Sequence, residues 1–166
     1  MAVANTKSTA ISNADATPVV LNSQRVVNGF LRESVASVEV AAADDDNSVY
    51  RFVRVPSNAR ISSVEYANDA ITGGTDYNVG VFETAANDGA AVSENLFADA
   101  LDLSSANAFT ACTYETTATN ISKVDQELWQ LLGLAKDPGK EYDICAKGIT
   151  VGSGAGTIAL RVKFAA

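Results

Sequence analysis

Short runs in which apolar and polar residues alternate are the feature that most restricts how this chain can fold. In the clearest run, near the C-terminus, every second residue is apolar: Ile158, Leu160, Val162, Phe164. Arg161 and Lys163 lie between them. This period of two is that of a β-strand with one face in a core and the other in solvent. The outward Arg161 and Lys163 are interpreted either as contacts for an acidic partner or as guards against edge pairing.

Similar runs recur at spacings of about 8 to 15 residues, which predicts about eight short strands. They lie at 26–31, 38–40, 49–55, 59–66, 77–81, 97–103, 111–115, 142–146 and 158–164. In the run 59–66 the apolar phase changes between Ile61 and Val64, which predicts a β-bulge. Turns are expected at Gly73-Gly74 and Pro138-Gly139, and Asn28-Gly29 predicts a hairpin between Val26-Val27 and Phe30-Leu31.

One helix is predicted late in the chain. Ser122 is the expected N-cap, Gly133 the expected terminator, and the apolar residues between them share one face: Val124, Leu128, Leu131, Leu132. A parallel α/β fold would need several crossover helices. The expected fold class is therefore all-β, an antiparallel, jelly-roll-like β-sandwich with one short helix.

The first two dozen residues differ from the rest, because they are mostly Ala, Ser, Thr, Asn and Asp. We expect an extended N-terminal arm over residues 1–24 and a β-sandwich domain over residues 25–166. Such an arm is either ordered by a neighbouring subunit or a frayed terminus.

The absence of histidine and a formal net charge of −8 exclude several classes of function. Without histidine there are no Ser/His or Cys/His nucleophiles and few zinc sites. The negative charge disfavours nucleic acid as a partner. No apolar run is long enough to span a membrane, and residues 1–11 lack the pattern of a secretory signal. No cofactor and no metal are predicted, and Cys112 and Cys145 are expected as reduced thiols.

Four patterns resemble functional sites but are interpreted as structure. The acidic run Asp44, Asp45, Asp46 lacks the glycine and distal glutamate of a calcium loop and predicts a solvated turn. The glycine-rich run 152–156 lacks the Lys-Ser/Thr of a phosphate loop and predicts a hairpin loop. A glycosidase would need paired acids, for which the candidates are Glu65, Asp69, Asp76, Glu83. A sugar platform would need exposed aromatic residues from the set Tyr50, Tyr66, Tyr77, Trp129, although Tyr66 and Tyr77 share the parity of core positions.

Two stretches carry a resemblance to a known family. Residues 50–82 read YRFVRVPSNARISSVEYANDAITGGTDYNVGVF, residues 128–148 read LWQLLGLAKDPGKEYDICAKG, and residues 155–164 read AGTIALRVKF. Together they resemble the head decoration, or cement, proteins of tailed bacteriophages, over roughly residues 48–166. The shared motifs are turns and strands and include no catalytic signature.

The resemblance implies a jelly-roll-like sandwich that trimerises on the capsid exterior and clamps neighbouring subunits of the major capsid protein. The chain would be made in the host cytoplasm and located on the virion. A symmetric trimer gains affinity because its first contact raises the effective concentration of the others. The predicted partner-binding residues are those that follow the arm and offer apolar or bidentate anchors: Val19, Leu21, Arg25, Phe30. They are alternatively the start of the core.

Two other classes of function remain as alternatives. A carbohydrate-binding module would also be an acidic β-sandwich with aromatic residues. A carboxylate-based glycosidase is the enzyme alternative, although no paired-acid motif points to it.

Overall fold

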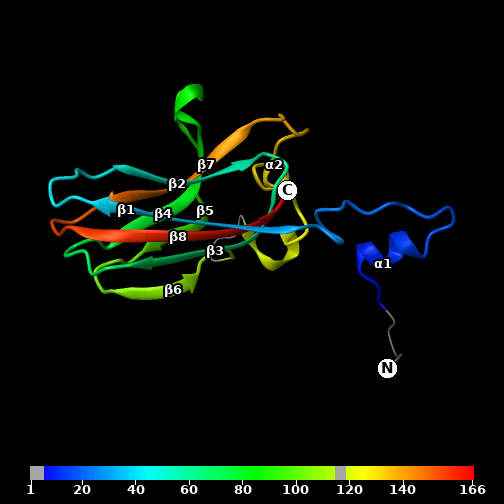
Figure 1. Cartoon of the computed structure of the whole chain (residues 1–166), viewed down its shortest axis with the longest axis horizontal. Helices are drawn as coiled ribbons and strands as arrows, with labels where there is room; N and C mark the ends of the chain where they lie inside the picture. Colours follow the sequence, from blue (N-terminus) through cyan, green and yellow to red (C-terminus); the bar gives the residue numbers. More distant parts are fainter. Residues whose placement is uncertain (1–5, 115–118) are drawn as a thin grey trace.

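The computed structural model describes residues 6–114 and 119–166, and within them eight strands form two antiparallel sheets (Figure 1). The strands are β1 (Leu31–Val40), β2 (Val49–Pro56), β3 (Arg60–Asn68), β4 (Asp76–Glu83), β5 (Ala91–Leu101), β6 (Asn107–Ala111), β7 (Glu141–Thr150) and β8 (Gly156–Ala165). Four short helical segments accompany them: α1 (Thr9–Ala14), η1 (Ala85–Asn87), η3 (Ile121–Lys123) and α2 (Leu128–Leu131). None of these described helices has the length and apolar character needed to cross a membrane.

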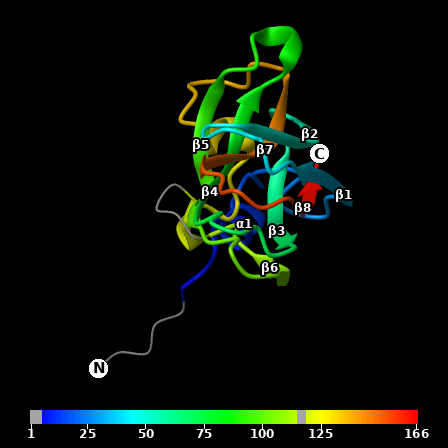
Figure 2. The ribbon, with the colours of Figure 1, turned by 90° about the vertical axis from the view of Figure 1, so that its left-hand side faces the viewer.

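The strand order is that of a jelly roll. One sheet has the order β1-β8-β3-β6 and the other β2-β7-β4-β5, and the two layers are separate in Figure 2, which looks along the strands. Each connection between successive strands crosses from one sheet to the other, except the β4–β5 hairpin. The predicted all-β, antiparallel, jelly-roll-like sandwich is therefore confirmed.

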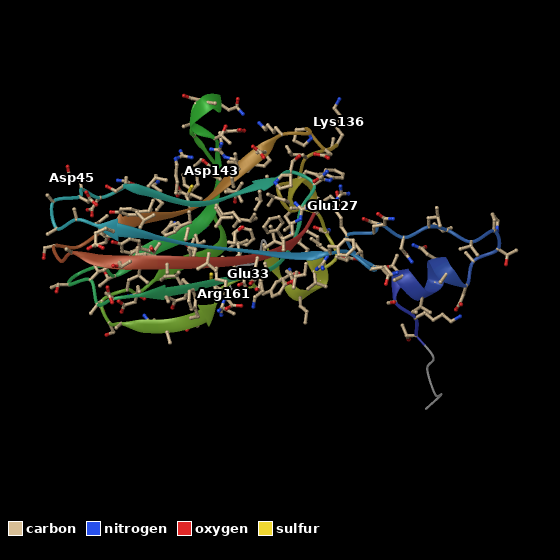
Figure 3. All side chains as sticks on the ribbon, in the orientation of Figure 1. Glu33, Asp45, Glu127, Lys136, Asp143 and Arg161 are labelled. Atoms are coloured by element: carbon tan, nitrogen blue, oxygen red, sulfur yellow. The ribbon has the colours of Figure 1, made fainter. Side chains whose placement is uncertain are left out.

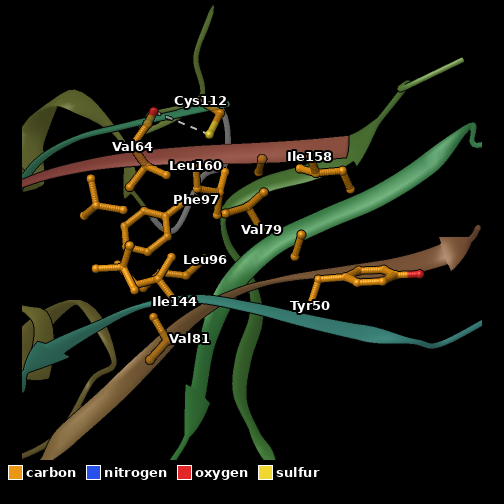
Figure 4. Close-up of a cluster of buried hydrophobic side chains, with 14 of the residues drawn as sticks. Tyr50, Val64, Val79, Val81, Leu96, Phe97, Cys112, Ile144, Ile158 and Leu160 are labelled. Carbon is orange, nitrogen blue, oxygen red and sulfur yellow. Dashed lines mark hydrogen bonds between the residues drawn. The ribbon is translucent and has the colours of Figure 1, made fainter. Parts of the chain in front are cut away.

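The core lies between the sheets and is built by the alternating side chains of the central strands (Figure 4). In β8, Ile158, Leu160, Val162 and Phe164 are all buried, as the sequence pattern predicts. The register of β3 against β8 shifts between Ile61 and Ser63, which confirms the predicted bulge. Tyr77 is fully buried and its ring centroid lies 6.4 Å from that of Tyr50.

The predicted helix is wrong in length and in its N-cap. Instead of one helix from Ser122, the chain forms η3, capped by Asn120, and the four-residue α2, which begins after Glu127. The backbone N–H groups of Leu128 and Trp129 donate to carbonyls of the β2–β3 turn, at 2.8 and 2.9 Å, and so tie the start of α2 to the sandwich. Gly133 does end α2, with a φ of +72°.

The predicted hairpin at Asn28-Gly29 is also wrong. The N–H groups of Val26 and Val27 both donate to the carbonyl of Ser23, so this stretch is a turn and the first strand begins at Leu31. A Cβ on Gly29 would lie 2.6 Å from the carbonyl oxygen of Gln24, so this position accepts only glycine without a shift of the backbone.

Three further boundaries differ from the prediction. The glycine-rich loop 152–156 joins β7 to β8 in different sheets, so it is a crossover and not a hairpin loop. The predicted strand at 97–103 covers only the last five residues of the eleven-residue β5, which ends at Leu101. The candidate strand at 111–115 overlaps β6 only at Ala111, where β6 ends, and Glu115 is outside the described residues.

Candidate interaction surface at the arm end

The N-terminal arm is a small hydrogen-bonded unit that lies beyond the sandwich (Figure 1). Residues 8–22, here called the arm lobe, consist of α1 and the chain that returns along it. The N–H of Val20 donates to the carbonyl of Asn13 at 3.1 Å, and the Asn13 side-chain amide donates to that of Asn22 at 2.8 Å. Asn22 in turn donates to the carbonyl of Ala10 at 3.0 Å. The sequence did not predict α1.

The arm lobe has no buried helix face of its own. No residue of α1 is buried, and a six-residue helix is too short to be stable in water without packing. The large apolar side chains of the arm lobe are exposed: Ile11, Val19, Val20, Leu21. Leu21 is 90% exposed. An ordered lobe of this kind is typical of a segment that another chain covers.

Glu127 holds the base of the arm on the sandwich. Its Oε1 atom lies 3.3 Å from Nη1 of Arg25 and accepts from Ser23 Oγ at 3.4 Å. Its Oε2 atom accepts from Nε1 of Trp129 at 2.9 Å. The carbonyl of Arg25 accepts from Nε of Arg60 at 2.7 Å. These contacts, here called the Glu127 clamp, fix the point where the arm leaves the domain.

The four predicted partner-binding residues line one groove. Val19, Leu21, Arg25 and Phe30 surround an open hollow of about 690 Å³ between the arm, Gly29 and the C-terminal Ala166. Val19 is 62% and Phe30 86% exposed, so neither begins the core. The structure thus brings the predicted set together, and its role in binding stays a prediction.

Sequence reasoning missed several residues at the same end of the sandwich, here called the arm end. Glu127 and Arg60 of the clamp are far from the arm in sequence, and no local pattern connects them to it. Ile121, Val124 and Leu134, in the long connection between β6 and β7, are also exposed. Ile121 and Leu134 belong to no periodic run, and Val124 was assigned to the apolar face of the predicted helix, so none of the three was expected to be exposed.

The opposite end of the sandwich is acidic (Figure 3, where Asp45 marks it and Glu127 lies at the arm end). Its four loops, at 41–48, 69–75, 102–106 and 151–155, contain no lysine or arginine. Their acidic residues are Asp44, Asp45, Asp46, Asp69, Asp102. The two ends of the molecule therefore differ in character, one apolar and mixed in charge, the other uniformly negative.

In the triple aspartate, the carboxylates of Asp44 and Asp46 accept hydrogen bonds that hold the neighbouring loops. Asp44 Oδ2 accepts from the Ala41 N–H and from the Tyr50 hydroxyl, both at 3.0 Å. Burial and the adjacent Asp44 raise the pKa of Tyr50. Asp46 Oδ1 accepts from the N–H of Val151 at 3.0 Å. Among residues 6–114 and 119–166 no cluster of three potential ligands is placed to hold a metal ion.

Arg161 and Lys163 do not guard an edge, because β8 lies between β1 and β3. Arg161 binds Glu65 through Nε at 2.8 Å and also through Nη2, and Lys163 Nζ lies 3.2 Å from the same carboxylate. The hydrogen bond from Arg161 holds the pKa of Glu65 below its ordinary value. Both cations are thus compensated within the sheet, which leaves little charge for an acidic partner.

Glu65 and Glu83, two of the candidate acids of the glycosidase alternative, lie in different sheets. Glu65 lies on the outer face of the β1-β8-β3-β6 sheet, whereas Glu83 is in the other sheet and binds Lys140. Tyr77 and Tyr50 are buried, and Tyr66 packs against the core, which confirms the packing interpretation of Tyr66 and Tyr77. No open aromatic platform forms from these three tyrosines.

Comparison with known proteins shows a shared fold without shared sequence. No protein-family model and no curated protein matches the chain. Among solved structures, a chain of "Capsid of Ralstonia phage GP4" matches with a TM-score of 0.59 and 16% identity, over 82% of this chain and 84% of that chain. Chains of "Cyanophage Pam1 capsid asymmetric unit" and "Acidic stable capsid structure of Helicobacter pylori bacteriophage KHP30" match with TM-scores of 0.44 and 0.43, identities of 14% and 15%, and coverage of 82% of this chain and 85% and 94% of theirs. The first match shows that the jelly roll of this chain also occurs in a chain of that capsid.

Proposed function

We propose that this chain is a structural protein of a phage virion, and specifically a decoration or cement protein of the head. In this role it binds the outside of the capsid and stabilises contacts between subunits of the major capsid protein. The observation that carries the proposal is the fold match to a chain of the Ralstonia phage GP4 capsid over 82% of the sequence. The resemblance of residues 50–82, 128–148 and 155–164 to decoration proteins points to the same role.

The arm end is the surface that we propose to face the shell. It combines the groove of Phe30 and Arg25 with the exposed Ile121, and apolar area removed from water is the main source of binding free energy. The acidic end then faces solvent, where its negative charge keeps the protein soluble and away from nucleic acid. We propose that three copies assemble as a homotrimer, so that weak contacts repeat around one axis.

The alternatives have less support. A carbohydrate-binding module needs exposed aromatic faces, but Tyr50 and Tyr77 are in the core. A glycosidase needs two facing carboxyl groups, and Glu65 and Glu83 lie in different sheets. We therefore propose a role in binding and none in catalysis.

The test is to add the purified full chain to phage heads that were assembled without it and to image the heads by cryo-electron microscopy. We expect stoichiometric density on the outer surface that follows the capsid symmetry, with the arm end toward the shell. A variant that lacks residues 1–22 should bind more weakly. Heads that gain no ordered density would contradict the proposal, and binding through the acidic end would contradict the proposed orientation.

A further inference from the structure

β1 is a sheet edge without the features that protect the other edges. In the described part of the chain the sheets end at β1, β6, β2 and β5. β2 has a bulge between Arg51 and Val53 and ends at Pro56, β5 shifts register against β4 at three places, and β6 is only five residues long. β1 runs for ten residues, pairs with β8 without a register shift, and contains no proline or glycine. A long regular edge of this kind is a template for a strand of another chain.

The outer side of β1 carries two exposed apolar side chains among polar and charged ones, at the positions Leu31, Glu33, Val35, Ser37 and Glu39. Leu31 is 59% and Val35 56% exposed, although both lie in a regular strand. Glu33, between them, has a distant ion-pair partner, since Lys163 Nζ is 3.9 Å away and closer to Glu65. A strand placed along this edge would gain backbone hydrogen bonds and would cover both apolar side chains.

The arm contains a segment with the properties of such a strand. Residues 19–22 read VVLN, carry no charge and belong to no helix or strand. Val19 and Leu21 are exposed, and β-branched and large apolar residues suit a pleated edge. The N–H of Val20 donates to the carbonyl of Asn13, so one side of this segment is already held by α1. The segment therefore loses less conformational entropy when it binds.

The Glu127 clamp prevents this segment from reaching the β1 edge of its own domain. Ser23 and Arg25 are fixed to Glu127, and the N–H of Val26 donates back to Ser23, so the chain turns at once into residues 26–30. Figure 1 shows the arm lobe continuing away from the sandwich beyond the start of β1. The segment 19–22 and the β1 edge are thus on one chain but held apart, which is the arrangement of an arm exchanged between copies.

We propose that residues 19–22 of one copy add as a strand to the β1 edge of a second copy of this chain. The two surfaces differ, so the contact is head to tail, and three such contacts can close a ring. The inference names the contact between copies of the proposed trimer and rests on the proposed function only for the number of copies. Its test uses the purified chain without phage heads, so that its outcome is independent of head binding.

Disulfide cross-linking tests the contact directly. Both native cysteines are buried, so we expect them to form no disulfides that would obscure the result. The Leu21→Cys chain is co-expressed with a second chain that has a tag of different length and carries a cysteine on β1, as Leu31→Cys, Val35→Cys or Ser37→Cys. In the matched control the second chain instead carries Val92→Cys, on the edge strand β5. After mild oxidation we expect a covalent mixed pair with at least one β1 position and none with the control. A chain carrying both Leu21→Cys and the best β1 cysteine should give covalent trimers.

Sedimentation of the uncross-linked protein gives the second measurement. The full chain should form an oligomer at about 10 µM, whereas Val35→Lys, or deletion of residues 1–22, should shift it to monomer, because a lysine on an edge opposes strand addition. Val92→Lys should leave the oligomer unchanged. A monomeric full chain, an oligomer that survives both changes, or cross-links no more frequent than those of the control would each overturn the inference.

Discussion

Nη1 of Arg25 lies 3.3 Å from Oε1 of Glu127, although 102 positions separate the two residues in sequence. Arg25 belongs to the turn that ends the arm, and Glu127 to the N-cap of α2. The contact joins the turn at the end of the arm to the long connection between β6 and β7. It therefore determines where the arm leaves the sandwich.

Glu127→Ala should loosen the arm and lower stability. The change removes the acceptor of Arg25, Ser23 and Trp129 at once, and we expect the free energy of unfolding in urea to fall by about 1–2 kcal/mol. Limited proteolysis should cut the arm faster. Glu141→Ala, at an exposed acid on β7, is the control and should change neither measurement. An arm of unchanged protease resistance would show that the clamp does not hold it.

Asp143 should make stability fall in acid. Burial by itself raises the pKa of Asp143, but hydrogen bonds from Arg54 at 2.7 Å and from Arg51 at 3.0 Å outweigh it, so the pKa lies below its ordinary value. At a pH between the lowered pKa and the ordinary aspartate pKa, the unfolded state binds more protons than the folded state. The contribution of Asp143 to the free energy of unfolding is therefore complete above about pH 5 and is lost as the pH falls. No histidine is present, so the curve should be nearly flat from about pH 5.5 to 8.

Asp143→Asn is the variant that isolates this effect. We expect it to lower the free energy of unfolding by about 2 kcal/mol at pH 7, because two guanidinium groups lose their shared carboxylate. Urea unfolding from pH 3 to 7 should show the difference from the unaltered chain narrowing below about pH 4. A difference that stays constant over this range would mean that the charge of Asp143 does not contribute.

The strands of this fold could be predicted where alternation is local and strong. β8 and β4 have their pattern within single runs, and the phase change at Ile61 was sufficient to locate a bulge. The helix could not be predicted correctly, because Leu128 and Trp129 give their N–H groups to the β2–β3 turn, a contact across the fold. The first half of β5 was not predicted, because its residues, AVSEN, are mostly small or polar and its pairing with β4 is irregular.

For the candidate interaction surface, the sequence indicated a group of residues that the fold brings together, but not the residues that hold them in place. Val19, Leu21, Arg25 and Phe30 were selected because they follow a polar arm, and all four line one groove. Glu127 and Arg60 position that groove from distant parts of the chain, and only the three-dimensional fold brings them to Arg25. Ile121 belongs to no periodic run, so its exposure could not be inferred.

The two thiols should be unreactive in the folded protein. Both cysteines are buried, and burial raises the pKa of Cys145 to about 12, so almost no thiolate is present at neutral pH. A chromogenic thiol reagent at pH 8 should react with neither cysteine in the native chain and with both after denaturation. Rapid reaction of one thiol in the native state would show that β6 or β7 opens locally.

Gly80 should tolerate no side chain. A Cβ there would lie 2.1 Å from the carbonyl oxygen of Ser93 and 2.3 Å from the carbonyl carbon of Glu94, at the register shift of β5 against β4 between Val79 and Val81. Both contacts are with backbone, so we expect Gly80→Ala to cost about 2–4 kcal/mol in urea unfolding. At Gly139 a Cβ meets nothing within 4 Å, and Gly139→Ala should cost only the roughly 1 kcal/mol of a left-handed backbone. Equal effects at the two positions would contradict this close approach of the β5 backbone to Gly80.

Phe30 should contribute to binding and not to stability. Its side chain is 86% exposed at the rim of the groove, so Phe30→Ser should change the free energy of unfolding by less than about 0.5 kcal/mol. If the arm end faces the shell, the same change removes a large aromatic anchor and should weaken binding to phage heads by about tenfold or more. Val92→Ser, an exposed valine on β5, is the control for lost apolar area outside the arm end. Binding that is equal for Phe30→Ser and the control, measured by co-sedimentation with heads, would remove the groove from the docking surface.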